Sequence, residues 1–338
     1  LSWIIIYLGL GAIHSLVYLY QTKYFVYFHS KNSFINPKEK FYICANLCNN
    51  EKILPDWITE MKKLIKYIGY DKVIVSIYEN GDSKDKTQTY LKEFESFLNS
   101  KNIPNNIFMD HVVNKFKFPK LEMWSEFYRK LAERVSFLSI LRNRAMDYLY
   151  TLSNIDYNNT RVLFFNDIIF NYEDIISLIS TNKGDYDVAC GMDYYWSFYD
   201  TFVSIDLNGH RLEDHFPFFY NREAQDAFIE GDNIRVFSCW NGVISAKGKI
   251  FENKQVQFRN NTRRMPVPAS ECTLFNYDCY NLGFGKVIIN PWLVFGYEYQ
   301  CVYVRKYLGD KNEFKYPLSI FFNGIENIGT PQPSLVMG

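Results

Sequence analysis

The stretch RVLFFNDIIFNYEDI, residues 161–175, combines a short apolar run with a carboxylate directly at its end. The run from Val162 to Phe165 has the pattern of a buried strand. Asn166 and Asp167 interrupt it before apolar residues resume. Because an unpaired charge is costly to bury, Asp167 needs a partner. That partner is either a backbone N–H at the turn toward the next helix or a metal ion.

Strands and helices alternate on both sides of this stretch. Short apolar runs predict strands, and apolar residues at helical spacing predict helices. This alternation predicts an α/β fold with a mainly parallel sheet covered on both faces, in which ligands bind beyond the carboxyl ends of the strands. The predicted strands are 40–47, 70–80, 105–113, 161–165 and 186–194, and the predicted helices lie within 49–69, 83–100, 120–152 and 171–180.

The regular alternation fades after residue 195, where Gly, Pro, Asn and aromatic residues become frequent. This composition is typical of a loop-rich region that binds an acceptor. The predicted organisation is an N-terminal anchor and stem (1–35), one domain over 36–325 with a nucleotide-sugar half (36–195) and an acceptor half (196–325), and a tail (326–338).

The bulk composition excludes one class of partner and permits a large core. The chain has 338 residues, of which 48% are hydrophobic, and 37 basic residues balance 37 acidic ones. Without a net positive charge, nucleic acid is not an expected partner. The seven cysteines form no CxxC pair and show no spacing typical of zinc ligands.

The N-terminal stretch LSWIIIYLGLGAIHSLVYLYQT, residues 1–22, contains no Asp, Glu, Lys or Arg. A helix of this length spans the apolar core of a bilayer, about 30 Å thick. We therefore expect a single-pass anchor with the body in the lumen, where some cysteines can pair. A cleaved signal peptide and a buried amphipathic helix are the alternatives.

Polar residues gather at the carboxyl ends of the predicted strands. Asn46 and Asn50 follow the first strand, and the loop after the second strand contains Glu79, Asn80, Ser83 and Asp85. Such a loop can hold a ribose or nucleobase through carboxylate and amide groups. Alternatively, Ser83 and Asp85 begin the next helix as a cap and a first-turn acid.

Arg142 and Arg144 flank Asn143 within LSILRNRAMDYL, residues 138–149, a segment that is otherwise largely apolar. Two arginines in a buried helix require anions, and a diphosphate is a suitable one. The alternative is an arginine paired with a carboxylate of the core.

Asp167 has the position expected of a metal ligand, at a strand end facing a ligand crevice. Oxygen ligands suit Mn²⁺ or Mg²⁺, and such an ion neutralises a leaving diphosphate. Position 165 is Phe, so the pattern is not Asp-x-Asp but a single carboxylate helped by Asn166.

The later part of the chain supplies aromatic, amide and carboxylate groups of the kind that bind sugars. Trp240-Asn241 can instead belong to a turn, and Glu271 can instead form a structural ion pair. The candidates are Asp193, Asp200, Trp240, Asn241 and Glu271.

Taken together, these segments resemble the cryptococcal mannosyltransferase family, the fungal capsule-associated α-1,3-mannosyltransferases. The resemblance runs from about residue 40 to 300 and rests on YICANLCNNEKILPDWI, VSIYENGDSKDKT, LRNRAMDYL, VLFFNDIIFNYEDII, ACGMDYYWSFYDTFVSIDLNGH, VFSCWNGVISAKGKIF and SECTLFNYDCYNLGFGKVIINPWLVFGY. It implies a GT-A-like, Rossmann-type transferase that uses GDP-mannose and Mn²⁺ or Mg²⁺, forms an α-1,3 linkage with retention, and is anchored in a Golgi or other secretory membrane as a type II protein.

The resemblance also implies roles for the candidate residues. Asp167 is implied as the metal ligand, with Asn166 beside it, and Glu271 as a residue facing the reacting sugars. Arg142 and Arg144 are implied to contact the diphosphate. The nucleoside would contact Glu79, Asn80, Ser83 and Asp85, with Asn46 nearby, and the donor sugar or the glycan acceptor would contact Asp193, Asp200, Trp240 and Asn241.

Three further interpretations of the sequence stay open. No His follows Glu271, although many GT-A enzymes complete the metal shell with a late His. A weak metal site would favour a non-catalytic, transferase-like scaffold in polysaccharide synthesis or export. The second interpretation is a transferase with another nucleotide sugar, and the third is a hydrolase, which would need two facing carboxylates.

Overall fold

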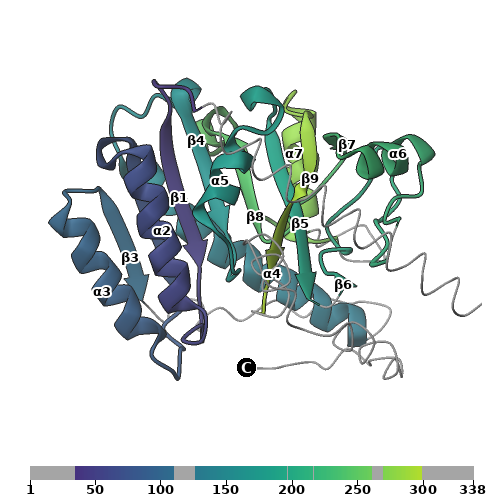
Figure 1. Cartoon of the computed structure of the whole chain (residues 1–338). Coiled ribbons are helices and arrows are strands. Elements are labelled where there is room, and N and C mark those ends of the chain that lie inside the picture. The colour runs from purple at the N-terminus through teal and green to yellow at the C-terminus, as the bar shows by residue number, and fades with distance from the viewer. Residues whose placement is uncertain (1–34, 110–125, 196, 216, 261–268, 299–338) are drawn as a thin grey trace, which may run out of the picture. The chain divides into compact units, whose positions relative to one another are not determined.

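The computed structural model describes residues 35–109, 126–195, 197–215, 217–260 and 269–298 (Figure 1). The strands are β1 (Lys40–Asn46), β2 (Val73–Glu79), β3 (Asn105–Met109), β4 (Thr160–Phe165), β5 (Val188–Tyr195), β6 (Ser197–Phe198), β7 (Ile234–Val236), β8 (Val243–Lys247) and β9 (Val287–Gly296). The α-helices are α2 (Leu54–Ile68), α3 (Thr87–Ser100), α4 (Glu126–Asp147), α5 (Tyr172–Ile179), α6 (Arg222–Glu230) and α7 (Glu271–Asn281). Short 3₁₀ helices are η1 (Tyr70–Lys72), η3 (Tyr148–Thr151), η4 (Tyr157–Asn159), η5 (Thr181–Gly184) and η6 (Gly248–Lys254).

The strands form one mainly parallel sheet in the order β3-β2-β1-β4-β8-β5-β9-β7, with β6 paired to β5. Strands β3, β2, β1 and β4 are parallel neighbours. Strand β8 runs antiparallel to both β4 and β5, so β5 and its parallel neighbour β9 point the same way as β4. In Figure 1 the arrowheads of β1, β3 and β5 accordingly point to the same, lower edge. The carboxyl ends of six strands therefore share one edge of the sheet.

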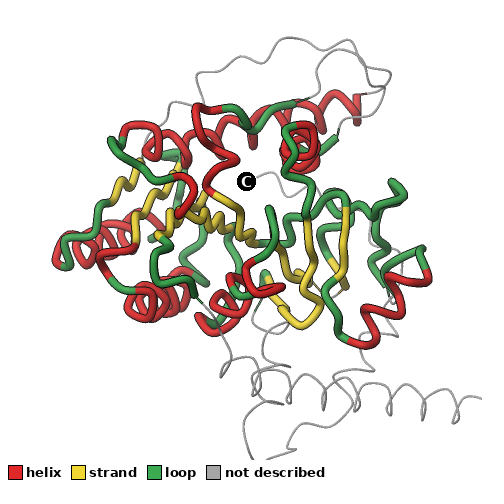
Figure 2. The backbone as a smooth tube through the Cα atoms, turned by 90° about the horizontal axis from the view of Figure 1, so that it is seen from above, coloured by secondary structure: helices red, strands yellow, loops and turns green. Residues whose placement is uncertain are grey.

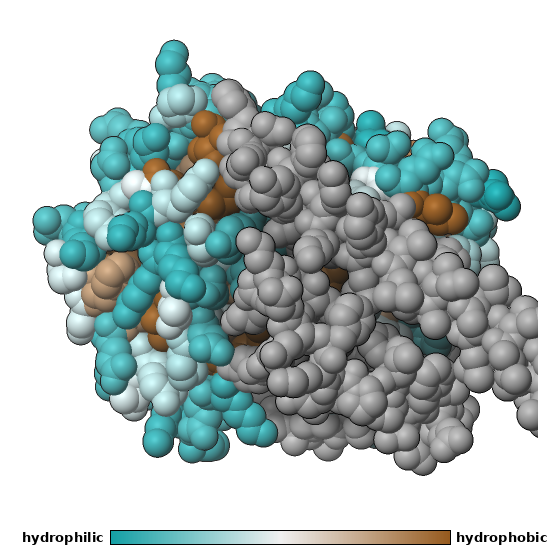
Figure 3. Space-filling view, in the orientation of Figure 1, coloured by the Kyte–Doolittle hydropathy of each residue, from teal (hydrophilic) through white to brown (hydrophobic). Residues whose placement is uncertain are grey.

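Helices cover both faces of this sheet (Figure 2). One apolar cluster joins α2, α3 and α5 to one face, and the other joins α4 and α7 to the opposite face. Helix α2 shows why: its residues at 54, 57, 58, 61, 64, 65 and 68 are buried, which is the spacing of one helical face. The outer side of the helices is mostly hydrophilic, as Figure 3 shows over α2 and α3.

The predicted α/β class and the mainly parallel sheet are confirmed. Each of the five predicted strands and four predicted helices has its counterpart, β1 to β5 and α2 to α5. The region after residue 195 contributes more regular structure than its composition indicates, because β8 and β9 flank β5 inside the same sheet.

Of the predicted anchor and stem, residues 1–34 lie outside the described residues, and so does the predicted tail. Within the described ranges, none of the helices has the length and apolarity that a bilayer crossing requires.

Candidate active site

Polar residues converge at the shared carboxyl edge of the sheet, where the sequence predicts a ligand site. Strand β4 ends at Phe165, and the next two residues, Asn166 and Asp167, are half-buried. Helix α4, which packs against β1 and β2, brings Arg142 to this edge, and the N-terminus of α7 brings Glu271.

Arg142 is the centre of a buried network. Its Nε donates to Glu271 Oε1 at 2.9 Å, and its Nη1 donates to Asn166 Oδ1 at 3.1 Å. Trp240 Nε1 donates to the same Asn166 oxygen at 3.1 Å, and the guanidinium lies 4.2 Å from the Trp240 ring centroid. We call Arg142, Asn166, Trp240 and Glu271 the arginine network. The two hydrogen bonds to Asn166 hold the side chain of this residue, which precedes Asp167, in one orientation.

Backbone conformation explains the place of Trp240. The two following residues, Asn241 and Gly242, both have positive φ, 53° and 80°, which is the conformation that Asn-Gly pairs favour in tight turns. A Cβ on Gly242 would come within 2.6 Å of Ile168, and the Gly242 carbonyl accepts a 2.8 Å hydrogen bond from Asn166 N. A side chain larger than hydrogen is thus excluded at position 242.

The same turn is fastened to β5. A disulfide joins Cys190 of β5 to Cys239, which directly precedes Trp240. Asn241 Nδ2 donates to the Gly191 carbonyl at 2.6 Å, and Asn241 Oδ1 accepts from Ser204 Oγ at 2.7 Å. Asn241 therefore uses its side chain to hold the turn in place.

An acidic pair, Asp193 and Asp200, lies beside the arginine network. Asp193 Oδ1 accepts from the backbone N–H of Asp200 at 3.2 Å, and its Oδ2 accepts from the Tyr297 hydroxyl at 2.9 Å. Burial raises the pKa of Asp193 well above its ordinary value, and the neighbouring Asp200 adds to this. Burial also raises the pKa of Asp200 to about 6, although the Asn241 N–H and Arg142 act in the opposite direction. The pair thus retains protons that exposed carboxyls have lost.

The raised pKa values of Asp193 and Asp200 predict that the free energy of unfolding falls as the pH rises from about 4 to 6. Between the ordinary Asp pKa and the raised pKa of Asp200, the folded state binds a proton that the unfolded state has released, so the free energy of unfolding falls with pH. Asp200→Asn should reduce this fall, as measured by urea unfolding at pH 4.5 and 7. The exposed Asp71→Asn should leave it unchanged, and an equal slope in both variants would contradict the prediction.

One carboxylate oxygen of Asp167 accepts a hydrogen bond, and the other is available to bind a ligand. Its Oδ2 accepts from Asn50 Nδ2 at 3.0 Å, whereas Oδ1 has no hydrogen-bond partner among the described residues. No group of three or more His, Cys, Asp or Glu side chains with metal-site geometry exists in the described part of the chain. The amide oxygen of Asn166 already accepts two hydrogen bonds from the arginine network. The donor set therefore suits an ion that takes one carboxylate from the protein and its other ligands from phosphate and water, as Mg²⁺ commonly does.

The loops after β1 and β2 are joined by hydrogen bonds between them. Asn49 N donates to Ser83 Oγ at 3.0 Å, Asn50 N to Thr87 Oγ1 at 2.7 Å, and Glu51 N to Asp85 Oδ2 at 2.9 Å. Since Asn50 also bonds Asp167, the first loop connects the second loop to the end of β4.

Glu79 organises the predicted nucleoside loop from within. The residue has no exposed surface, and its carboxylate accepts hydrogen bonds from Gly81 N, Ser83 N, Ser83 Oγ and Gln88 Nε2 at 2.7–3.1 Å. Helix α3 begins at Thr87, so Ser83 is not its cap. Asp85 Oδ1 accepts from Thr87 N at 2.9 Å, and these hydrogen bonds, although burial opposes them, hold the pKa of Asp85 below its ordinary value. Asn80 stays in the loop, also buried.

Asn46 lies at the carboxyl edge of the sheet, whereas Arg144 does not. Asn46 Nδ2 donates to the Leu141 carbonyl at 2.8 Å, and its Oδ1 is buried with no hydrogen-bond partner among the described residues. Arg144, two residues from Arg142, points to another side of α4, because residues two apart do not face each other on a helix. Its guanidinium pairs with Asp147 at 3.3 Å and is 41% exposed. The structure therefore brings Arg142 to the site but not Arg144.

Glu271 is buried, with its carboxylate engaged by Arg142 and by Ser270 Oγ at 3.3 Å. We expect Glu271→Gln to lower turnover by about 10- to 100-fold, the scale of a displaced positioning group. A nucleophile would lose nearly all covalent catalysis in the same variant. The measurement is kcat at saturating donor, and a fall of more than about 10⁴-fold would identify a nucleophile.

Sequence reasoning missed one residue of the site, Tyr297, and one contact, that of Asn50 with Asp167. Tyr297 follows β9 and bonds Asp193, but a single tyrosine among 27 gives no signal in the sequence. Asn50 marks the polar cluster after the first strand, yet its contact with Asp167 spans 117 residues and appears only in the fold.

The comparisons with known proteins agree on the family. The family model described as cryptococcal mannosyltransferase 1 matches residues 40–278. Alpha-1,3-mannosyltransferase CMT1 from Cryptococcus neoformans var. neoformans serotype D is 26% identical over 282 residues. That match covers 77% of this chain and 58% of the relative, so the chain spans little more than half of that relative's length.

Two solved structures are more distant. S. aureus TarS 1-349 is 12% identical with a TM-score of 0.43, covering 80% of this chain and 65% of that one. The mannosyltransferase PcManGT from Pyrobaculum calidifontis, in complex with GDP-Man and Mn2+, is 9% identical with a TM-score of 0.40, covering 86% and 66%. Structural similarity at this level does not support a conclusion about function. The family model, in contrast, spans most of the chain, and the protein belongs to the cryptococcal mannosyltransferase 1 family.

Proposed function

We propose that the chain is a glycosyltransferase that moves mannose from GDP-mannose to a mannose-containing acceptor, with α-1,3 linkage, retention and the help of Mn²⁺ or Mg²⁺. The observation that carries the proposal is the family match over residues 40–278, which includes Asp167 and all four members of the arginine network. The name of the fungal relative supports mannose as the sugar and α-1,3 as the linkage.

Asp167 is the proposed metal ligand. The ion would supply charge neutralisation for the departing diphosphate. The available Oδ1 of Asp167 supports this role, and Asn50 would hold the carboxylate in orientation through Oδ2.

Arg142 is the proposed diphosphate partner. Burial makes its charge more effective, and Glu271 and Asn166 keep its guanidinium in one orientation. Arg144 lies on another side of α4, so it would contact the ligand only if the ligand extended past the helix.

The nucleoside would lie against the loop after β2. Glu79 and Asp85 would shape this loop, while Asn80 and the loop backbone would contact the base or ribose. Asn46 would support this edge of the site from β1, since its Nδ2 donates to the Leu141 carbonyl. The half-buried Asp200 would contact the donor sugar, while the buried Asp193, Trp240 and Asn241 would support the wall of the sugar site.

We further propose, from the uncharged stretch at residues 1–22, that the body lies in the lumen of a Golgi or other secretory membrane on a single N-terminal anchor. The runner-up function is a non-catalytic, transferase-like scaffold. The observation favouring it is that the described ranges contain no group of three or more His, Cys, Asp or Glu side chains that could hold a metal ion.

The test is release of free nucleotide from a panel of GDP- and UDP-sugars by the full chain, with Mn²⁺ and with EDTA. The proposal predicts metal-dependent turnover of GDP-mannose above all other donors. Turnover of a UDP-sugar instead would show that this UDP-sugar, and not GDP-mannose, is the donor. Failure of every donor, together with no thermal shift by GDP and Mn²⁺, would favour the scaffold.

A further inference from the structure

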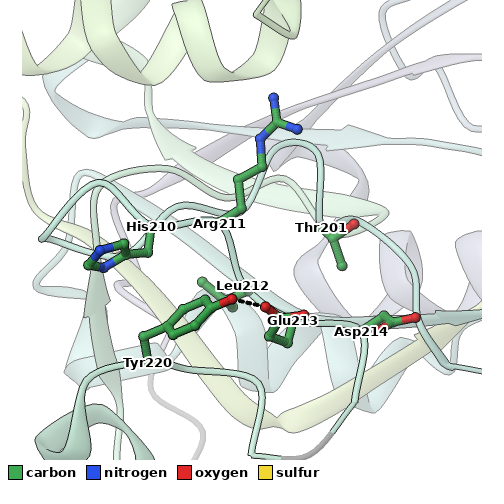
Figure 4. A pocket seen from close by; sticks show the side chains of 7 residues that line it. All are labelled: Thr201, His210, Arg211, Leu212, Glu213, Asp214 and Tyr220. Carbon is green, nitrogen blue, oxygen red and sulfur yellow. Dashed lines mark hydrogen bonds between the residues drawn. The ribbon is translucent and has the colours of Figure 1, made fainter.

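A cavity of about 400 Å³ opens in the segment between β6 and α6, outside the arginine network (Figure 4). Its size falls in the range of small-ligand sites, about 300–1,000 Å³. The lining residues are Thr201, His210, Arg211, Leu212, Glu213, Asp214 and Tyr220.

The cavity is connected to the candidate active site through the backbone. Thr201 directly follows Asp200, whose carboxylate accepts a 3.0 Å hydrogen bond from Asn241 N. The backbone N–H of Leu212 donates to the Ser204 carbonyl, and Ser204 Oγ donates to Asn241 Oδ1. Two separate connections thus tie the wall of the cavity to the turn that carries Trp240.

The cavity is formed in advance of any ligand. Asp206, which is buried, holds the turn before His210 by accepting hydrogen bonds from Asn208 N at 2.9 Å and His210 N at 2.8 Å. Tyr220 lies beside this turn, with its ring centroid 5.3 Å from that of His210, and its hydroxyl donates to Glu213, a contact visible in Figure 4. A preformed wall lowers the entropy cost of binding.

The chemistry of the lining fits a neutral sugar. Tyr220 is 58% exposed and offers an aromatic face with a polar end, and the apolar side chain of Leu212 also lines the cavity. Glu213 and Asp214 are acceptors for hydroxyl groups, and their charge disfavours a phosphate or a nucleotide. The guanidinium of Arg211 lies 4.8 Å from the Phe202 ring centroid, so its charge is directed to that ring. Figure 4 shows it pointing away from Tyr220 and Glu213.

We propose that this cavity binds the acceptor saccharide, with Tyr220 stacking on a neutral hexose ring and Glu213 accepting its hydroxyls. This inference rests on the proposed function, since an acceptor implies a transfer. Thr201 in the cavity wall directly follows Asp200, so the wall of the cavity continues into the segment proposed to contact the donor sugar.

The test uses the full chain with GDP-mannose, Mn²⁺ and either methyl α-mannoside or α-1,3-mannobiose as acceptor. Tyr220→Ala and Glu213→Gln should each raise the KM for the acceptor about tenfold, which corresponds to about 1.4 kcal/mol. The KM for GDP-mannose and its hydrolysis by water without acceptor should stay within twofold. The matched controls are Tyr280→Ala, with a tyrosine that is 60% exposed on α7, and Glu230→Gln, an exposed residue of α6 outside the cavity. An acceptor KM unchanged in both cavity variants would overturn the inference.

A binding measurement separates failure of this inference from failure of the proposed function. If wild type turns over no donor, saturation-transfer NMR with methyl α-mannoside at tens of millimolar still reports on the cavity. Saturation lost in Tyr220→Ala but retained in Tyr280→Ala would support a saccharide site without transfer. No saturation in wild type, or equal saturation in both variants, would overturn it.

Discussion

Asp167→Asn is expected to lower the turnover of GDP-mannose by about 10³-fold. An ion that neutralises a leaving diphosphate contributes several kcal/mol to transition-state stabilisation, and each 1.36 kcal/mol is a factor of ten in rate. An amide replaces the charged oxygen that would hold this ion, while its remaining carbonyl oxygen still accepts from Asn50. The measurement is the initial rate of nucleotide release at saturating Mn²⁺.

Stability serves as the control for this variant. Asp167 is half-buried and its one hydrogen bond survives the change, so the free energy of unfolding should shift by no more than about 1 kcal/mol. A rate within threefold of wild type, in a variant this stable, would show that Asp167 holds no essential ion.

Arg142→Met is the second large effect, and it acts on folding as well as on catalysis. Removing Arg142 leaves the carboxylate of Glu271, itself only 3% exposed, without its cation. Breaking a buried ion pair in this way costs about 3–5 kcal/mol. Urea unfolding should show this loss, and turnover in the remaining folded protein should fall by at least about 10²-fold, the effect of removing one preorganised donor.

The double variant Arg142→Met/Glu271→Leu separates the two roles. Replacing a buried pair by apolar groups of similar volume is often neutral for stability, so we expect the double variant to recover most of the lost free energy. Turnover should remain low, because no cation then faces the diphosphate. Recovery of turnover along with stability would mean that Arg142 only supports the fold.

The sequence was sufficient for the sheet and helices before residue 195, because buried strands and amphipathic helices have distinct periods. Strands β8 and β9 escaped prediction, although both flank β5 in the sheet. Their segments lie among Gly, Pro, Asn and aromatic residues, and strand pairing over long separations leaves no local period.

The candidate site was predictable as a set of residue types but not as a set of contacts. Of the two interpretations of Arg142, the pairing with a core carboxylate is confirmed, and contact with a diphosphate stays a prediction. Arg144 could not be separated from Arg142 by composition, although their spacing alone places them on different sides of a helix. The interior role of Glu79 depends on four hydrogen bonds that only the folded loop creates. The acceptor cavity likewise has no sequence motif, because Tyr220 and Glu213 lie in an irregular segment.

The most direct test of the account is calorimetric titration of GDP into the full chain with Mn²⁺ and with EDTA, in wild type and in Asp167→Asn. A one-carboxylate site needs phosphate oxygens to complete the metal shell, so metal and nucleotide should bind together. We predict that Mn²⁺ lowers the Kd of GDP at least about tenfold in wild type, a coupling of about 1.4 kcal/mol, and not in the variant. Equal affinity for GDP with and without the metal, or a metal effect that survives Asp167→Asn, would contradict the assignment of this sheet edge as a metal-assisted nucleotide-sugar site.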